Sequence, residues 1–234
     1  TSSMKIGAMM GTCIPLPVLR AFQAAQTHIK VIQGYGLTVT LPMITLVEPD
    51  QAGVKMGSIG RAVPGVEVKI VDEDGKELGV DDPGEIITRG PHVMKGYFRR
   101  ADATAERIRN GWLYTGDIGK RGADGYYYHL GRRDDMIITG GLNVYPAEVE
   151  NLIYTYAGVQ ETIVFAIPDA KRGQVLGAAV VPRPGSSINE RELLTFLRAN
   201  LANFKVPDRI VVREALPRTS SGKTIREAET LLAD

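Results

Sequence analysis

The stretch GRRDDMIITGGLNVYPAEVENLIYTY, residues 131–156, decides how the chain is divided. Its polar start separates two apolar segments, and such interruptions are typical of a boundary between domains. The segment DMIITGG is a short apolar run before a pair of glycines, which predicts a strand and a turn. From Pro146 onward apolar residues recur at helical spacing, and proline suits the first position of a helix. We therefore expect a separate small domain over residues 132–234.

The remainder of this C-terminal part predicts a mixed α+β domain. The run ETIVFAIP, 161–168, alternates apolar and other residues as a strand does. The run NERELLTFLRANL, 189–201, has a leucine stripe at helical spacing, with Asn189 as the helix cap. About 100 residues of this kind suffice for a domain with its own core.

Residues 46–131 have the pattern of short strands between turns. VEVKIVD, 66–72, alternates apolar and charged residues, and DEDG, 72–75, is a hairpin signal. GEIITRG and GYYYHLG are further glycine-bounded strands, and DATAERI predicts one helix with Asp102 as its N-cap. This region is expected to be a small β-rich subdomain.

Residues 1–45 have an α/β pattern. PLPVLRAFQAAQ, 15–26, places Val18, Leu19, Phe22 and Ala25 on one helical face. HIKVIQ then predicts a buried strand that runs into the glycine-bracketed turn GYGLT. Junctions of this kind hold ligands in many α/β sheets, and elsewhere are plain connections.

Composition excludes several classes of protein. The 234 residues are 44% hydrophobic with a net charge of +1, so the core can be sizeable and there is no overall attraction to nucleic acid or membrane. One cysteine, Cys13, excludes an internal disulfide, and three scattered histidines disfavour a zinc site. No membrane-spanning run or signal peptide is visible, and a cytoplasmic protein is expected.

A basic segment near the C-terminus ends in Gly-Lys-Thr. PRTSSGK, 217–223, is not a P-loop, because Pro217 stands where that loop needs a glycine whose N–H faces the phosphates. Between residues 198 and 226, two acids accompany these basic residues: Arg198, Lys205, Arg209, Arg213, Arg218, Lys223 and Arg226. Such a segment suits a small anionic ligand, although a solvated face has the same composition.

Four polar motifs occur in a fixed order: QGYGLT (33–38), GWLYTGD (111–117), GRRDDMIITGGLNVYPAEVE (131–150) and PRTSSGK (217–223). Together they resemble the adenylate-forming enzymes, most closely the acyl-CoA synthetases (acyl-CoA ligases). The resemblance covers nearly the whole chain, including GSIGRAVPGVEVKIVD and GEIITRGPHVMKGYF. It implies that residues 1–131 are the C-terminal part of a large adenylation domain, with 1–45 α/β and 46–131 a distorted barrel. Residues 132–234 would be the small mobile α+β domain.

The resemblance also implies an activity and its residues. The family forms an acyl-adenylate from a carboxylic acid and ATP with Mg²⁺, releases pyrophosphate, and passes the acyl group to the thiol of CoA. Asp117 would accept hydrogen bonds from the ribose hydroxyls, and Arg132 would contact the ribose and phosphate side. The remaining implied nucleotide-binding residues are Gly11, Thr12, Gly34, Tyr35, Gly36 and Thr38. Tyr35 would lie against the adenine; its alternative role is core packing.

In the same family, the lysine of the PRTSSGK-type loop reaches the carboxylate and the α-phosphate, which makes Lys223 the catalytic residue of adenylation. The small domain then rotates about a hinge at Asp134, and Gly140 and Gly141 would line the passage for CoA. An ordinary turn is the other reading of Asp134.

Two departures from the family pattern stand out. Val39 replaces the glutamate that helps hold Mg²⁺, and valine cannot ligate a hard cation. The serine- and threonine-rich phosphate loop and the first half of the large domain are not found. We therefore expect this chain to be the C-terminal portion of a synthetase, incomplete alone, with the missing portion or a second copy as its partner.

Two other functions stay open on sequence alone. An adenylation domain that loads a carrier protein is the near alternative, although GGLNVYPAEVE is more similar to the CoA-ligase branch. A non-catalytic nucleotide-binding relative is the second, favoured by Val39 and opposed by Asp117, Arg132 and Lys223. The small-molecule acid cannot be read from the residues.

Overall fold

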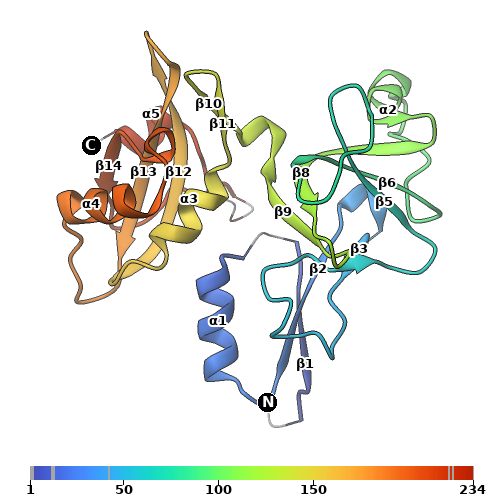
Figure 1. Cartoon of the computed structure of the whole chain (residues 1–234), viewed down its shortest axis with the longest axis horizontal. Helices are drawn as coiled ribbons and strands as arrows, with labels where there is room; N and C mark the ends of the chain where they lie inside the picture. Colours follow the sequence, from blue (N-terminus) through green and yellow to red (C-terminus); the bar gives the residue numbers. More distant parts are fainter. Residues whose placement is uncertain (1–2, 12–13, 42, 221, 223, 234) are drawn as a thin grey trace. The chain divides into compact units, whose positions relative to one another are not determined.

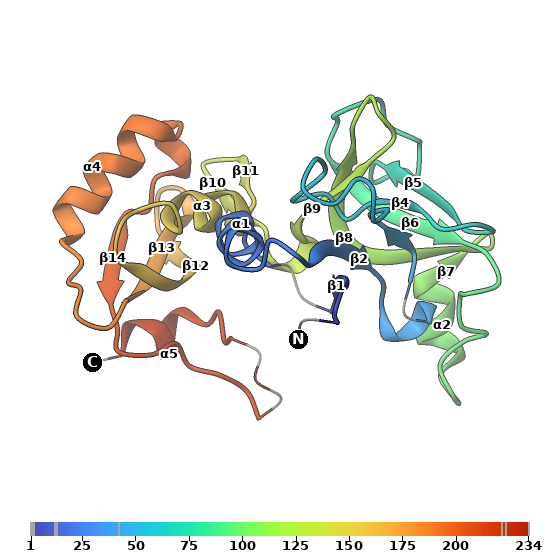
Figure 2. The same ribbon diagram turned by 90° about the horizontal axis from the view of Figure 1, so that it is seen from below.

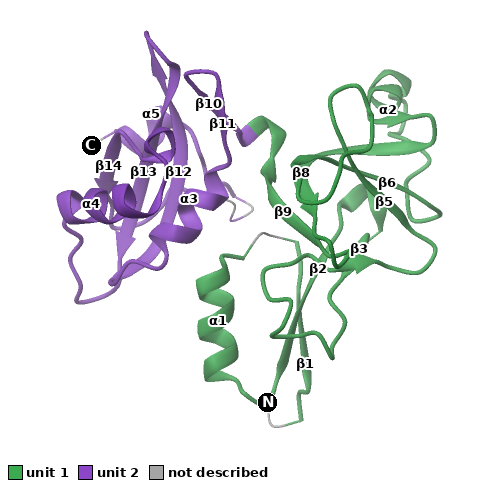
Figure 3. Cartoon of the chain, in the orientation of Figure 1, with its two compact units in different colours: residues 1–134 green, residues 135–234 purple. Residues whose placement is uncertain are grey.

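A computed structural model of the chain describes residues 3–11, 14–41, 43–220, 222 and 224–233. The described residues form two compact units, 1–134 and 135–234, which Figure 3 shows in green and purple. The division therefore falls inside the segment GRRDD. The mixed α and β content agrees with the predicted fold class.

The first part of unit 1 is a β-α-β arrangement (Figure 1). Its sheet has the order β1-β2-β3-β4, in which β1 and β2 are parallel and the other pairs antiparallel. Helix α1 connects the two parallel strands, as a crossover must. The elements are β1 (Ile6–Met9), α1 (Leu16–Ala25), β2 (Lys30–Tyr35), η1 (Thr38–Thr40), β3 (Thr45–Leu46) and β4 (Arg61–Ala62).

Helix α1 forms where the apolar spacing predicts it, but its apolar face is only partly covered. Leu19 is fully buried, whereas Val18 and Phe22 keep 43% and 40% of their surface exposed. Pro17 lies in the first turn, where its missing N–H has no helical partner to lose.

The second part of unit 1 is an antiparallel sheet in the order β5-β6-β8-β7, with β9 paired to β8. Its elements are β5 (Glu67–Val71), β6 (Gly84–Arg89), α2 (Ala101–Arg107), β7 (Ile108–Arg109), β8 (Trp112–Arg121) and β9 (Tyr127–Arg132). The predicted cap of α2 is wrong. Arg100 occupies the N-cap position, and Asp102 lies in the first turn, where its carboxylate pairs with the Arg100 guanidinium at 3.0 Å.

The two sheets of unit 1 meet at Gly60. Its carbonyl accepts a hydrogen bond from Tyr127 N at 2.9 Å, and it has φ +92°. A Cβ on residue 60 would lie 2.0 Å from the carbonyl carbon of Leu46, so this close approach of two backbones requires glycine. The core beneath the junction contains Ile44, Ile86 and Tyr127.

Unit 2 is a sheet with helices on both faces. The strand order is β11-β10-β13-β12, and β14 runs parallel to β13. Figure 2 shows α3 and α4 on the opposite side of the sheet from α5. The elements are η2 (Arg133–Asp135, shared with unit 1), β10 (Ile137–Thr139), β11 (Leu142–Val144), α3 (Pro146–Ile153), β12 (Val159–Asp169), β13 (Gly173–Pro182), α4 (Glu190–Asn200), η3 (Asn203–Lys205), β14 (Arg209–Val212) and α5 (Ala228–Leu232).

Alternation along β12 supplies a core on each face. Val164 packs with Val149 and Leu193 beneath α3 and α4, whereas Phe165 packs with Leu231 of α5. Each fully buried side chain of this size stabilises the fold by roughly 1.5–3 kcal/mol. Asn189 caps α4 as predicted, because its side chain accepts hydrogen bonds from the backbone N–H groups of Arg191 and Glu192.

Candidate active site

The hairpin of β8 and β9 brings two of the predicted residues together. Its register places Asp117 directly opposite Arg132, and a bulge between Ile118 and Gly119 then brings His129 opposite Gly119. Bulges redirect side chains locally, which is one reason they are common beside functional sites.

The Asp117 carboxylate is the centre of a polar cluster. The Tyr35 hydroxyl donates a hydrogen bond to Asp117 Oδ2 at 2.6 Å, and Arg132 Nε donates to Asp117 Oδ1 at 3.3 Å. His129 Nε2 lies 3.8 Å from Oδ1. Asp117 is 3% exposed. The two groups that donate to its carboxylate come from different strands, Tyr35 from β2 and Arg132 from β9.

The backbone around Asp117 is fixed by its neighbours in the sheet. Thr115 Oγ1 donates to Ile86 O at 2.6 Å and accepts from Asp117 N at 3.1 Å. The N–H of Gly116, which has φ +77°, donates to Glu85 Oε1 at 2.8 Å. The motif YTGD thus needs its threonine and glycine to aim the aspartate.

The cluster sets the charge state of its members. Burial raises the pKa of Asp117, but the nearby His129 imidazole, the Tyr35 hydroxyl and the Arg132 charge lower it more, so this pKa lies below its ordinary value. Burial and the neighbouring carboxylate raise the pKa of Tyr35 well above its ordinary value. At neutral pH Asp117 is therefore an acceptor and Tyr35 a donor.

Acidification is expected to destabilise the protein through Asp117. Because its pKa is lower in the folded state than the value of about 3.9 in an unfolded chain, its contribution to stability is present above that value and lost as the pH falls through the folded pKa. Urea unfolding of the wild type and of Asp117→Asn should give free energies whose difference is constant above about pH 5 and shrinks as the pH falls from about 5 to about 2. A gap that stays constant over this range would contradict the assignment.

The glycine-rich segment lies at the end of β2. Tyr35 is the last residue of that strand and packs in the core with Ile44. Gly34 faces Met10 so closely that an added Cβ would lie 2.8 Å from the Met10 sulfur. Gly36 follows the strand, and Thr38 is exposed at the start of η1. Tyr35 thus packs in the core, as the alternative role has it, and its contact with the adenine stays a prediction.

Gly11 lies just beyond the carboxyl end of β1, as Gly36 does for β2. Because these strands are parallel, both glycines lie at the same edge of the sheet, where ligands bind in α/β proteins. Thr12 and Lys223, two further predicted site residues, lie outside the described residues.

The remaining predicted residues lie at the unit boundary and in unit 2. Asp134 is the last residue of unit 1, within η2. Gly140 and Gly141 form the two-residue turn between β10 and β11, with φ of +57° and +82°. Such a turn needs positive φ at both positions, which by itself explains both glycines. Their contact with CoA stays a prediction.

Two residues of the cluster were missed from sequence. His129 precedes Arg132 by three residues on β9, so strand alternation alone would put the two side chains on opposite faces, and no local signal predicted the place of His129. Glu85 is 9% exposed and accepts from Arg133 Nη1 at 3.1 Å as well as from Gly116. Arg133 is half-exposed and orients toward this acid.

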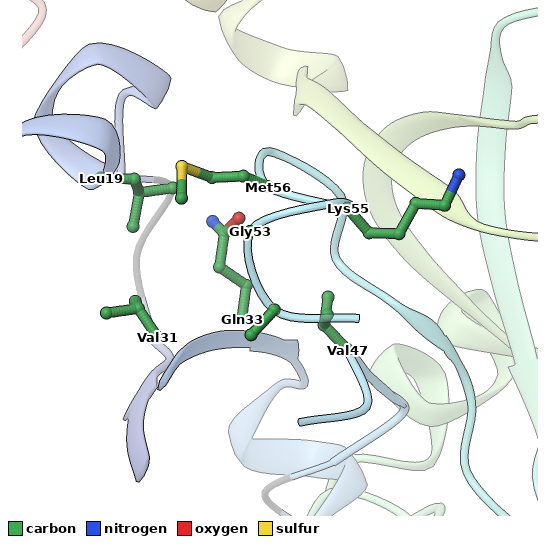
Figure 4. Close-up of a pocket in the computed structure, with 8 residues that line it drawn as sticks. Leu19, Val31, Gln33, Val47, Gly53, Lys55 and Met56 are labelled. Carbon is green, nitrogen blue, oxygen red and sulfur yellow. The ribbon is translucent and has the colours of Figure 1, made fainter. Parts of the chain in front are cut away.

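A separate small pocket in unit 1 is lined by none of the predicted site residues (Figure 4). Its lining is mostly apolar, and the Lys55 amine is directed away from it and pairs with Asp124. Gln33 Oε1 accepts a hydrogen bond from Gly57 N at 2.9 Å. The lining residues are Leu19, Val31, Gln33, Val47, Ala52, Gly53, Lys55 and Met56. The hollow is a packing gap between α1, β2 and the following loop.

Neither a metal-binding cluster nor a membrane-spanning helix is found in the part of the chain that the structure describes. In it, no group of three or more His, Cys, Asp or Glu side chains is placed to hold a metal ion. Among the helices of the same residues, none is both long and apolar enough to cross a membrane.

The candidate site therefore consists of a buried acceptor, an aromatic donor and an arginine beside a glycine-rich strand end. The family model described as AMP-binding enzyme matches residues 1–98, and the AMP-binding enzyme C-terminal domain matches residues 148–223. The chain belongs to the AMP-binding enzyme family.

Curated relatives are acyl-CoA-forming enzymes of greater length. A feruloyl-CoA synthase from Amycolatopsis sp. is 40% identical over 212 residues, covering 91% of this chain and 43% of that protein. A long-chain-fatty-acid–CoA ligase from Escherichia coli O157:H7 is 41% identical over 196 residues, covering 84% and 35%. The chain therefore spans about two fifths of the length of the curated relatives it matches.

A solved structure has the same fold. The o-succinylbenzoate CoA synthetase from Bacillus subtilis, in complex with its acyl-adenylate intermediate OSB-AMP, matches with a TM-score of 0.85 and 36% identity. The match covers 95% of this chain and 45% of that one. The same synthetase has also been solved with ATP and magnesium ion.

Proposed function

We propose that the protein containing this chain is an acid–thiol ligase, which converts a carboxylic acid to its CoA thioester through an acyl-adenylate. The observation that carries this proposal is the buried Asp117 carboxylate, held between Tyr35 and Arg132 in a chain of the AMP-binding enzyme family. A carboxylate that stays ionised and has lone pairs to spare can accept hydrogen bonds from two neighbouring hydroxyls, as a ribose presents them.

Each half-reaction balances without a further reactant. An oxygen of the substrate carboxylate attacks the α-phosphorus of ATP, the bond to the bridging oxygen breaks, and pyrophosphate leaves. The CoA thiol then attacks the acyl carbon, the bond from that carbon to the AMP oxygen breaks, and the thiol proton is released. Asp117 and Arg132 hold the nucleotide through both steps.

Lys223 provides the positive charge of the first half-reaction. Negative charge gathers at the carboxylate and α-phosphate as the new bond forms, and a preorganised cation lowers that barrier. In this proposal unit 2 is the mobile domain, Asp134 is its hinge, and rotation exchanges Lys223 for the Gly140–Gly141 turn, beside which CoA enters. The short η2 segment at the unit boundary and the family membership of both units support it.

Magnesium fits less well than the nucleotide. Val39 offers no oxygen donor at the position where the family motif has an acid, and its carbonyl is engaged by Met94 N at 2.9 Å. The described residues near β2 therefore do not supply a side-chain ligand there, and Mg²⁺ would arrive with the triphosphate of ATP. We also propose a cytoplasmic location for the protein, because the proposed reaction uses ATP and CoA.

Exchange of labelled pyrophosphate into ATP tests the proposal directly. Ferulate, o-succinylbenzoate and palmitate represent the acids of the named relatives, and each is supplied with ATP to this chain and to any longer protein that contains it. Acid-dependent exchange followed by AMP release on addition of CoA is expected of the complete enzyme. Exchange without CoA thioester, but with transfer to a phosphopantetheinyl carrier protein, would indicate carrier loading instead.

A non-catalytic nucleotide-binding relative is the second candidate, because Val39 favours it. In the complete enzyme, Val39→Glu is expected to lower the Mg²⁺ concentration for half-maximal exchange by about tenfold, the equivalent of one interaction of about 1.4 kcal/mol. The rate at saturating Mg²⁺ should change less than about twofold, since the remaining machinery is intact.

Val39→Gln, with a neutral amide of similar size, is the matched control and should leave the Mg²⁺ dependence unchanged. A wild type without exchange that gains it only with glutamate would show a decayed site and support the non-catalytic relative.

A further inference from the structure

The segment that carries Lys223 is anchored in unit 2 by an arginine before it and another after it. Arg218 Nη2 donates to Glu161 Oε2 at 2.6 Å, and its Nη1 donates to Gly222 O at 3.1 Å. Arg226 follows Lys223 by three residues. In the pair of Arg218 with Glu161, the side chains are 46% and 34% exposed.

The Arg226 guanidinium connects α3 to β12. Its Nη1 donates to Glu150 Oε1 at 2.5 Å and to Val164 O at 2.7 Å, and its Nη2 donates to Glu150 Oε2 at 3.3 Å. Glu150 Oε1 also accepts from Val164 N at 2.8 Å. The Arg226 and Glu150 side chains are 34% and 13% exposed, so this bidentate pair is screened by water less than the Arg218 pair.

The same guanidinium reaches the start of unit 2. Arg226 Nε lies 3.8 Å from Asp135 Oδ2, and Asp135 directly follows the proposed hinge residue Asp134. One side chain thus faces a helix, a strand and the first residue after the boundary. A movement that carries α3, β12 and Asp135 together therefore also carries Arg226.

The base of the loop is closed by its own backbone. Ile225 N donates to Pro217 O at 2.9 Å, and Arg218 and Thr224 form an isolated antiparallel bridge. Gly222 N donates to Thr219 O at 2.9 Å, with Gly222 at φ +84°. The two ends of the loop, 217–218 and 224–226, therefore lie side by side. Only two residues separate Arg226 from Lys223 in the sequence.

We propose that Arg226 and Glu150 are positioning residues for adenylation: their pair makes the base of the 217–226 loop a rigid part of unit 2, so that a hinge movement delivers Lys223 in one orientation. This inference rests on the proposed function of Lys223. Displacement of a catalytic group by about 1 Å can lower a rate by about 10²-fold, so a loosened base is sufficient to impair the chemistry.

A purely structural role predicts a different outcome. If the pair only stabilised unit 2, its loss would affect both half-reactions and the whole unit alike. If it positions the loop, its loss would slow acyl-adenylate formation, in which Lys223 acts, and spare thioester formation, in which it does not.

The half-reactions of the complete enzyme separate these outcomes. The probes are pyrophosphate exchange with an acid that the wild type activates, and thioester formation from the matching synthetic acyl-adenylate and CoA. Arg226→Met and Glu150→Gln are each expected to slow exchange by about 10- to 100-fold and to change thioester formation by less than about twofold. The double variant should be little worse than either single one, because the residues act as a pair.

Matched variants control for charge and for folding. Arg198→Met removes an exposed arginine from the last turn of α4 and should leave both rates unchanged. Arg226→Lys keeps the charge but lacks the planar fork, so an intermediate loss is expected. Because it is the milder change, it keeps the test open if Arg226→Met fails to fold.

Hydrogen exchange gives a readout that does not depend on activity. In Arg226→Met the Ile225 amide should exchange about tenfold faster or more, a loss of about 1.4 kcal/mol of local protection, while the Leu176 amide of β13 stays protected. Unchanged exchange at Ile225, or equal loss in both half-reactions, would overturn the inference. If Lys223→Ala leaves adenylation intact, the proposed function of the lysine fails instead, and the exchange at Ile225 still shows whether Arg226 orders the loop.

Discussion

Replacing Lys223 with alanine should lower the rate of acyl-adenylate formation by a factor on the order of 10²–10³. This is the range for removing one preorganised group that stabilises transition-state charge. Thioester formation from a supplied acyl-adenylate should stay within about twofold of the wild type, because in the proposed mechanism the lysine takes no part in that step. Pyrophosphate exchange and single-turnover thioester formation measure the two rates separately.

Lys171→Ala is the matched control for this experiment. Lys171 is an exposed lysine of the same unit, in the turn between β12 and β13, and both rates should survive its replacement. Equal loss of both half-reactions in Lys223→Ala would assign the residue to structure or to binding of the common nucleotide. Full retention of adenylation would remove it from the mechanism.

Replacing Asp117 with alanine should weaken ATP binding by about 10²-fold or more. A hydrogen bond to a charged group contributes about 1.5–3 kcal/mol, so loss of two to the ribose hydroxyls corresponds to at least about 3 kcal/mol, or two decades of affinity. Isothermal titration of ATP into the complete enzyme measures the dissociation constant. The change should appear in binding as well as in turnover, since the ribose is held throughout.

Asp117 also holds Tyr35, and a second variant separates the two roles. Tyr35→Phe removes the donor at 2.6 Å and keeps the ring, so it should weaken ATP binding much less than Asp117→Ala. Asp74→Ala, in the exposed hairpin turn after β5, controls for the loss of one negative charge. Unchanged ATP affinity in Asp117→Ala, with the fold retained, would show that the cluster is structural.

Local sequence signals account for much of the fold. The helix cap at Asn189, the proline start of α3 and the alternation along β12 act within a few residues, so spacing alone reveals them. The cap of α2 differs from the prediction, since Arg100 occupies the N-cap position and Asp102 lies in the first turn. The helical spacing of apolar residues after Pro146 continues to Tyr156 in the sequence, but α3 ends at Ile153, where turns lead into β12.

The candidate site is less accessible to such reasoning, because its members meet through sheet register. Asp117 and Arg132 could be paired from motif order, whereas the distance from His129 to Asp117 depends on a bulge that no local pattern announces. Glu85 joins the cluster from a third strand, 31 residues before Gly116 in the chain. The glycines at 140 and 141 show the reverse case, since a turn explains them without a ligand.

Residues 133–136 alone connect β9, whose last residue is Arg132, to β10 of unit 2. A covalent tether this short keeps each unit in the neighbourhood of the other at an effective concentration on the order of millimolar. In the proposed domain movement, docking contacts that would be negligible between separate molecules then suffice to populate each arrangement. Weak contacts also release quickly, so a tightly sealed surface between the units would slow the alternation.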